Sequence, residues 1–295
     1  MAAAPRRRDT RGIVDPAGLL TRVRFRRHLP APELRRYVER YWLIDWDLPE
    51  PYATHIVPHP SVNLTFQWDE AEGPPHAELT GIPTGLYTRK LTGRGRVCGV
   101  KFRPGGFRPY APGTPATHWT GKVLPAESVF PAANGTMART LTTPEAPEAA
   151  PDTAGPTDPT ARLAALDAFL LGALDAFLVA LAPEPDPQAD LAADLVRRVR
   201  ADRTVRRVTD LADLADLSVR ALQRLFSAYV GVAPKWVILR YRIHDALELA
   251  GTRRNVDWAT LAADLGYADQ AHLVRDFTGT VGVTPTAYAA NAGPE

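Results

Sequence analysis

The 295-residue sequence predicts a multidomain α+β protein in which an amino-terminal β-sandwich or barrel is followed by an all-helical domain. Three observations lead to this prediction. Between residues 23 and 130, short runs of aromatic and β-branched residues are separated by Pro and Gly, which is typical of strands. Residues 131–160 show no apolar periodicity. From Ala189 onward the pattern is helical, and it repeats.

Composition narrows the class of protein further. Apolar residues make up 45% of the chain, which excludes wholesale disorder, and the single Cys excludes a disulfide framework. Residues 1–40 hold 11 basic and 4 acidic side chains, so a polyanion is a candidate partner. Residues 1–22 are expected to form a flexible basic segment. Because no secretory signal is visible, we expect a cytoplasmic protein.

The β-rich domain is expected over residues 23–130. Four runs have strand character: Tyr41–Ile44, His55–Pro58, Val62–Phe66 and Val97–Phe102. A short helix is expected at Pro32–Val38, where Pro occupies a first-turn position. Six aromatic residues either line an apolar pocket or fill an ordinary core, and the sequence leaves both open: Trp42, Trp46, Tyr52, Phe66, Trp68 and Tyr87.

A linker and one apolar helix follow the β-rich domain. Residues 131–160 are rich in Ala, Pro and Thr and predict a flexible connection, with room for a short helix near Met137. Residues 161–182 carry Leu and Phe at intervals of three and four and predict an amphipathic helix. This helix packs either on its own β-domain or on a partner in a dimer. Asp167 and Asp175 in its middle argue against a membrane span, so no membrane association is expected.

An internal repeat organises residues 189–290. Six residues recur at an offset of 51: Leu222, Arg224, Phe226, Gly231, Val232 and Pro234 return as Leu273, Arg275, Phe277, Gly282, Val283 and Pro285. So many identities at one offset within thirteen residues indicate two copies of one helical unit.

Each copy has the plan of a helix-turn-helix unit. In the first copy, Ser218 is a favourable N-cap for the second helix of the unit. In the second, Gly266 supplies a left-handed turn position and Asp269 the cap. Residues 234–250 between the copies predict one helix of about 25 Å. With the thickness of the flanking helices, this length can place the two second helices about one DNA turn, roughly 34 Å, apart.

The outward faces of these second helices carry side chains suited to reading bases. In the first copy they are Val219, Arg220, Gln223 and Arg224, and in the second Gln270, Ala271, Val274 and Arg275. Arg can pair with guanine, Gln with adenine, and Val or Ala can contact the thymine methyl group. A solvated helix face would carry Arg and Gln equally well, but two such faces in tandem favour double-stranded DNA as the partner.

Residues 195–290 resemble the AraC/XylS family of bacterial transcription regulators. The resemblance rests on the run from Ser218 to Phe226, on the run from Trp258 to Phe277, and on the Gly-Val-x-Pro segments at Gly231 and Gly282. It implies a seven-helix domain, here residues 189–290, with two helix-turn-helix units and a linker helix. It also implies DNA contacts at Arg220, Gln223, Arg224, Gln270, Ala271, Val274 and Arg275. Asp216 departs from the family, many members of which have Gly there.

The amino-terminal section resembles a sensor-type domain found before this module. The likeness lies in Tyr41-Trp42, in the segment from Ile56 to Leu64, and in the segment from Gly99 to Phe107. It implies a cupin-like β-fold and a small-molecule effector. If the chain is a regulator, a second copy of itself is a candidate partner in a homodimer. If it is an activator, RNA polymerase is a further candidate partner.

No enzymatic chemistry is expected. His55, His59 and His76 lack the spacing of a metal site, and the sequence has no Walker motif, nucleophile elbow or His-Glu-x-x-His motif. We therefore expect no catalytic residue, metal or cofactor. The alternative to a DNA-binding regulator is a ligand-binding or protein-interaction module without DNA-binding activity.

Overall fold

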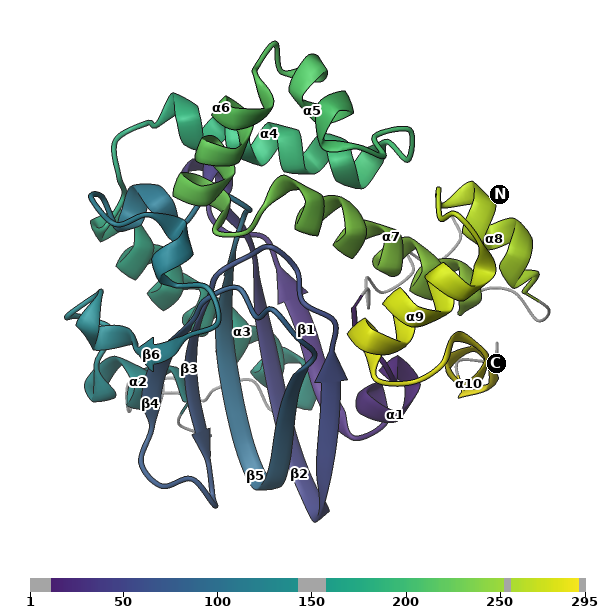
Figure 1. Cartoon of the computed structure of the whole chain (residues 1–295). Helices are drawn as coiled ribbons and strands as arrows, with labels where there is room; N and C mark the ends of the chain where they lie inside the picture. Colours follow the sequence, from purple (N-terminus) through teal and green to yellow (C-terminus); the bar gives the residue numbers. More distant parts are fainter. Residues whose placement is uncertain (1–11, 143–157, 252–255, 292–295) are drawn as a thin grey trace, which may run out of the picture.

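The computed structural model describes residues 12–142, 158–251 and 256–291. It has a β-rich half and a helical half, and the helical half covers one end and one side of the sheet (Figure 1). The sheet has six strands in the order β1-β2-β5-β3-β4-β6, and every pair is antiparallel. Its strands are β1 (Val23–His28), β2 (Val38–Ile56), β3 (Asn63–Asp69), β4 (His76–Thr80), β5 (Tyr87–Phe102) and β6 (Val123–Pro125).

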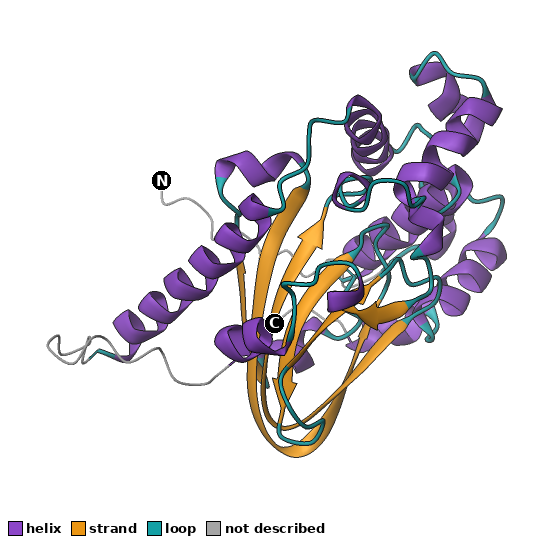
Figure 2. Ribbon diagram, turned by 90° about the vertical axis from the view of Figure 1, so that its left-hand side faces the viewer, coloured by secondary structure: helices purple, strands orange, loops and turns teal. Residues whose placement is uncertain are grey.

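The two central strands are long and bend back over the sheet. The register between β2 and β5 shifts between Leu48 and Tyr52, opposite Gly93, which has a φ of +55°. Figure 2 shows the strands curving at this end, so that one sheet encloses an interior. The expected sandwich or barrel is therefore built from a single bent sheet. The expectation that Tyr41–Ile44 and His55–Pro58 are separate strands is wrong, because an irregularity can bend a strand without ending it.

Alternation along the strands gives the sheet two different faces. Tyr41, Phe66 and Phe102 point to the outer face, where they are fully buried in the main apolar core. Trp42 and Trp46 point to the inner face. They lie opposite Gly99 and Gly95, and a Cβ at either glycine would lie about 2 Å from an indole atom. These glycines therefore give the indoles room to lie against the sheet.

Helix α3 (Pro159–Ala180) packs on the outer face of the sheet and buries apolar side chains there: Leu166, Leu170, Leu174, Phe177 and Leu178. This face of the helix thus packs on its own domain, and the dimer alternative stays a prediction. Its opposite face leaves Phe169 and Val179 exposed. Among the described residues, α3 is the one helix that is long and apolar enough to span a bilayer, and a third of its most apolar window is buried in the protein.

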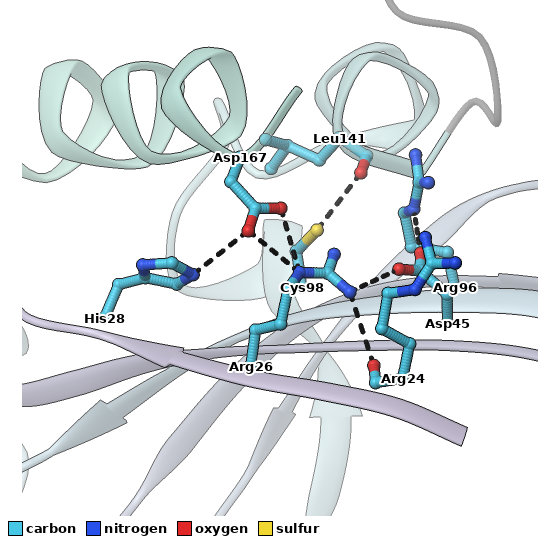
Figure 3. Close-up of polar contacts among 8 residues, drawn as sticks. All are labelled: Arg24, Arg26, His28, Asp45, Arg96, Cys98, Leu141 and Asp167. Atoms are coloured by element: carbon cyan, nitrogen blue, oxygen red, sulfur yellow. Dashed lines mark hydrogen bonds and ion pairs between the residues drawn. The ribbon is translucent and has the colours of Figure 1, made fainter. Parts of the chain in front are cut away.

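A polar network attaches α3 to the sheet (Figure 3). The Arg26 Nε donates to both carboxylate oxygens of Asp167 on α3 at 2.9 Å, and its Nη1 donates to Asp45 at 2.6 Å. Arg96 donates to the other oxygen of Asp45 at 2.5 Å. Further along α3, Asp175 accepts hydrogen bonds from the Tyr41 hydroxyl and the Ala31 backbone N–H. The two acidic residues of this apolar helix therefore fix its position on the sheet.

Segments around the sheet complete the amino-terminal domain. Residues 12–22, which the sequence assigned to a flexible segment, include a β-bridge from Ile13 to Ile56 and helix α1 (Pro16–Leu20), capped by Asp15. Residues 1–11 lie outside the described part. The expected helix at Pro32–Val38 is a 3-10 helix over Pro32–Arg36, because Val38 already begins β2. Within the predicted linker, α2 (Gly135–Thr142) packs on the sheet, and residues 143–157 lie outside the described part.

The helical half contains seven α-helices among its described residues: α4 (Pro187–Ala201), α5 (Val208–Leu214), α6 (Val219–Leu225), α7 (Pro234–Ala250), α8 (Trp258–Asp264), α9 (Gln270–Val281) and α10 (Pro285–Asn291). It is docked closely on the β-rich half. Gly105, with a φ of +81°, lies against Ala192 of α4, and the Thr120 hydroxyl donates to the Gly231 carbonyl at 2.6 Å. Val57 is buried with the apolar side chains of α7.

Candidate nucleic-acid interface and ligand cavity

The first helix-turn-helix unit consists of α5 and α6. Asp216 in the turn has a φ of +50° and is the only non-glycine residue with positive φ in the described part of the chain. Asp tolerates this conformation better than most residues, so the chain keeps the turn without glycine. Ser218 then caps α6 by accepting from the Ala221 backbone N–H at 3.2 Å.

The sequence of α6 separates its buried face from its exposed face. Leu222 and Leu225 are buried in the core shared with α4 and α7. The side chains predicted to read bases, Arg220, Gln223 and Arg224, are all exposed. The face of α6 that the sequence predicts to read bases is therefore open to solvent.

The second unit consists of α8 and α9. Gly266 has a φ of +75° in the turn, and Asp269 caps α9 by accepting from the His272 backbone N–H at 2.7 Å. Leu273 and Phe277 are fully buried. Of the predicted base-reading residues, Gln270, Ala271 and Arg275 are exposed, whereas Val274 is half-buried. The face of α9 that the sequence predicts to read bases therefore exposes three of its four predicted side chains.

Helix α7 connects the two units without a break over 17 residues, as the sequence predicts. Pro234 occupies its first turn, and it buries side chains toward both units and toward the β-rich half. His244 of α7 is fully enclosed, and burial lowers the pKa of its imidazole to about 3. The connecting helix is therefore held by packing along its length.

The inner face of the bent sheet encloses a cavity of about 220 Å³. Its apolar wall is formed mainly by aromatic and aliphatic side chains: Ile13, Leu19, Phe25, Trp42, Ile44, Trp46, Ile56, Tyr87, Leu91 and Val97. Of the six aromatic residues left open by the sequence, Trp42, Trp46 and Tyr87 line this cavity. Phe66 lies in the core, and Tyr52 and Trp68 are not part of the lining.

Cationic side chains also face the cavity, and no Asp or Glu is found among the described residues that line it. The cations are Arg27, Arg40, Arg89, Lys101 and Arg200. Glu39 lies behind them, 3.2 Å from the Lys101 amine and 3.7 Å from the Arg200 guanidinium. Burial opposes ionisation of Glu39, but Lys101 and Arg40 outweigh it and lower its pKa to about 2. The ionised carboxylate of Glu39 is therefore a shared counterion of Arg40, Lys101 and Arg200.

Two contacts connect the cavity to the helical half. Arg200, which lines the cavity, belongs to α4. His59, also in the lining, stacks its ring on His244 of α7, with centroids 4.1 Å apart and planes inclined by 15°. The His244 Nε2 donates to the Pro58 carbonyl at 3.1 Å. The cavity wall is therefore in direct contact with two helices of the other half.

Sequence analysis did not identify the cationic part of the cavity. The position of Lys101 between Val100 and Phe102 was the available signal, because a charged residue in an apolar strand faces the side opposite its neighbours.

Cys98, two residues before Val100, is buried with its thiol donating to the Leu141 carbonyl, and burial raises its pKa to about 12. That environment suits an inert thiol.

Comparisons with known proteins agree with this division of the chain. Residues 26–125 match a domain family of unknown function, DUF6597, and residues 211–291 match a helix-turn-helix domain family. No curated protein matches the chain. Among solved structures, ToxT from Vibrio cholerae O395 aligns at 11% identity with a TM-score of 0.40, over 91% of this chain and 98% of ToxT.

A second solved structure, unsaturated fatty acid bound wild-type ToxT from Vibrio cholerae strain SCE256, aligns at 14% identity with a TM-score of 0.40. It covers 84% of this chain and 94% of that one. The helix-turn-helix match spans α6 to α10 and most of α5, so it includes both predicted recognition helices, α6 and α9. Residues 211–291 therefore form a helix-turn-helix domain, a module that in DNA-binding proteins places its second helix in the major groove.

Proposed function

We propose that the protein regulates transcription by reading two successive major grooves with α6 and α9, under the control of a small molecule in the amino-terminal cavity. The observation that carries the proposal is the pair of exposed recognition faces attached to one continuous helix, α7. A connecting helix of about 25 Å suits two recognition helices that lie one helical turn of DNA apart. Such a protein acts in the cytoplasm and has no need of catalytic chemistry.

Affinity and sequence specificity would come from different groups. Arg side chains of the helical half would neutralise phosphates, which gives binding that weakens with salt, and backbone N–H groups would donate hydrogen bonds to phosphate oxygens. Arg220, Gln223 and Arg224 on α6, with Gln270, Ala271, Val274 and Arg275 on α9, would contact base edges.

Selection of bound duplexes from a random pool by the full-length chain tests this function. We expect an enriched site with two short elements about 10 bp apart, and affinity for it that falls steeply between 50 and 200 mM salt. If no element is enriched and binding to random duplex has a salt slope near zero, the chain is a ligand-binding or protein-interaction module without DNA-binding activity.

The lining of the cavity indicates the class of effector, an anion with an apolar body. Indole and aliphatic side chains on the inner face suit an apolar body, which they would remove from water. Lys101 and Arg200, which share Glu39, suit a carboxylate or a similar anionic group, since an added anion would be stabilised by both.

Occupancy of the cavity would reach the DNA-binding half through Arg200 and His59. An anion bound by Arg200 would hold α4, and a ligand against His59 would press on the ring that stacks on His244 of α7. A ligand controls an equilibrium only through contacts that differ between its two states. Contacts to α4 and α7 are of this kind, because they exist only while the halves are docked.

Thermal unfolding of the full-length protein with decanoate, 2-naphthoate and the corresponding neutral amides tests the effector class. We expect the carboxylates to raise the Tm and the amides to have little effect. Lys101→Met should abolish the response, whereas the exposed Lys90→Met, outside the lining, should keep it. Equal responses to acids and amides, or a full response in Lys101→Met, would contradict an anion site.

Two protein partners belong to the same proposal. A second copy of the chain would cover the exposed apolar side chains of α3, Phe169 and Val179. Analytical ultracentrifugation of the wild type and Phe169→Glu tests this pairing: a dimer that becomes a monomer supports it, and an unchanged monomer rules it out. An activator would also contact RNA polymerase. Increased transcription from a promoter that carries the selected site would support this contact.

A further inference from the structure

A direct contact joins the two helix-turn-helix units beside helix α7. Arg242 on α7 donates through Nη2 to the Arg206 carbonyl at 2.7 Å and through Nη1 to the Gly266 carbonyl at 3.3 Å. Arg206 immediately precedes the cap of α5 in the first unit, and Gly266 lies in the turn of the second. One guanidinium therefore bridges the backbones of both units.

Arg206 makes a second bridge in the opposite direction. Its Nη2 donates to the carbonyl of Asp264 at the end of α8, at 3.0 Å. The last carbonyls of a helix have no donor within the helix, so they are natural acceptors for a cationic side chain. The Arg206 backbone N–H in turn donates to Asp210 of α5 at 2.9 Å. Arg206 is thus tied to α5 at its backbone and to α8 at its side chain.

Packing around the bridge leaves little freedom. A Cβ on Gly266 would lie 2.8 Å from the Arg206 Cδ, so the two segments lie in close contact. The Arg242 guanidinium lies 5.7 Å from the centre of the Tyr267 ring, at the far side of the same turn. Tyr267 itself is buried in the core of the second unit. The bridge therefore ends on the turn that positions α9.

We propose that Arg206 and Arg242 are positioning residues that fix the rotation and separation of α6 and α9, and so decide which spacing of two DNA elements the protein accepts. The inference rests on the proposed two-groove function. Helix α7 alone fixes the direction of its two ends, but small bends or twists along its 17 residues alter the phase, that is, the rotation of α6 relative to α9. The bridge fixes that phase because it ties the units to each other at backbone atoms.

Duplexes carrying the two selected elements, with the spacing changed in single base pairs, provide the test in the full-length protein. We expect the wild type to favour one spacing at least tenfold over its neighbours. Arg242→Met, which keeps an unbranched apolar stem and removes the donors, should reduce this preference to about twofold or less. Base preference within each element should stay unchanged. Arg206→Met, at an exposed position, should act in the same direction.

Arg203→Met is the matched control. Arg203 pairs with Asp245 of α7, and within the described part of the chain it makes no hydrogen bond or ion pair to the second unit. Its loss should therefore leave the spacing preference intact. A wild-type spacing preference in Arg242→Met and Arg206→Met overturns the proposal. Uniformly weaker binding at every spacing, with a smaller salt slope, also overturns it, since it would make these residues phosphate contacts.

A second measurement does not depend on DNA. Spin labels at Gln223→Cys on α6 and Ala271→Cys on α9 report the distance between the units, and buried Cys98 does not compete for the label. We expect a narrow distance distribution in the otherwise wild-type chain and one at least twice as broad with Arg242→Met. An unchanged width overturns the bridge. A broader one with no enriched DNA site shows that the bridge exists and that the proposed function is wrong.

Discussion

Arg275 lies exposed on α9, one turn beyond Ala271, in the position that the repeat pairs with Arg224 on α6. A guanidinium bound to the O6 and N7 of one guanine discriminates against other bases at that position only. Arg275→Ala should therefore cost about 1–3 kcal/mol on the selected site and relax base choice at one position. Binding measured on single-base variants of the site checks this. An equal loss on every sequence would identify a phosphate contact instead.

His244 makes stability depend on pH. Burial lowers the pKa of its imidazole to about 3 in the folded protein, below its value in an unfolded chain. Since the unfolded state binds the proton more readily, stability falls as the pH drops below about 6.5. Between pH 7 and pH 5 this residue should cost about 2 kcal/mol.

Chemical unfolding of the wild type and of His244→Gln at several pH values measures this effect. Glutamine does not titrate, so the variant should lose the part of the pH dependence that lies between pH 7 and pH 5, whatever its absolute stability. An identical slope in both proteins would show that His244 is not enclosed as described.

Individual residues differ in how far the sequence predicted their roles. Gln223 and Arg275 could be placed on exposed faces because helical periodicity alone separates outside from inside. Lys101 and His244 could not be assigned, because their surroundings come from segments distant in sequence. Lys101 lies 3.2 Å from Glu39, and His244 stacks on His59, 185 residues earlier. The first contact is set by the pairing of β2 with β5, and the second by the docking of the two halves.

At the scale of single elements, α3 depends on its pairing with the sheet. Arg26 is only 12% exposed and divides its donors between Asp45 and Asp167. Removing one partner of a largely buried pair leaves a charge that the surroundings compensate incompletely. Asp167→Ala should therefore lower the free energy of unfolding by about 3 kcal/mol, as measured by urea denaturation. Asp190→Ala, which removes an exposed pair with Arg36, should change it far less, because solvent screens that pair.

The turn between α8 and α9 requires glycine for two reasons. Gly266 has a φ of +75°, and its missing Cβ leaves room for Arg206. Gly266→Ala should cost about 1–2 kcal/mol of stability. Gly279 offers a control within α9, because nothing lies within 4 Å of a Cβ there, and Gly279→Ala should stabilise by about 0.5–1 kcal/mol. Thermal melts of both variants should therefore move in opposite directions.

Elements with strong local patterns were predictable, and elements formed by distant contacts were not. The helix over residues 234–250 agrees with α7 because Pro234 and the apolar spacing define it locally. The sequence predicts two strands where the structure has the single strand β2, because Pro49, Glu50 and Pro51 resemble a turn in sequence. In the structure, β5 continues to pair on either side of this segment, and a bulge accommodates it.

At the scale of the whole molecule, the sequence established the order of the domains but not their docking. The internal repeat and the strand-like runs identify two halves of different class. Their interface depends on small groups such as Gly105 against Ala192 and Thr120 against Gly231, which have no pattern of their own. The cavity arises in the same way, because it is closed by the bend of the sheet and reached by Arg200 from the other half.

The central claim is that both recognition faces contact one duplex at the same time. Hydroxyl-radical footprinting on the selected site measures this most directly, with the wild type, with an α6 variant (Gln223→Ala, Arg224→Ala) and with an α9 variant (Gln270→Ala, Arg275→Ala). The wild type should protect two patches on one face of the DNA, about 10 bp apart, and each variant should weaken the patch under its own helix. A single protected patch, or two patches that both survive in both variants, would contradict the claim.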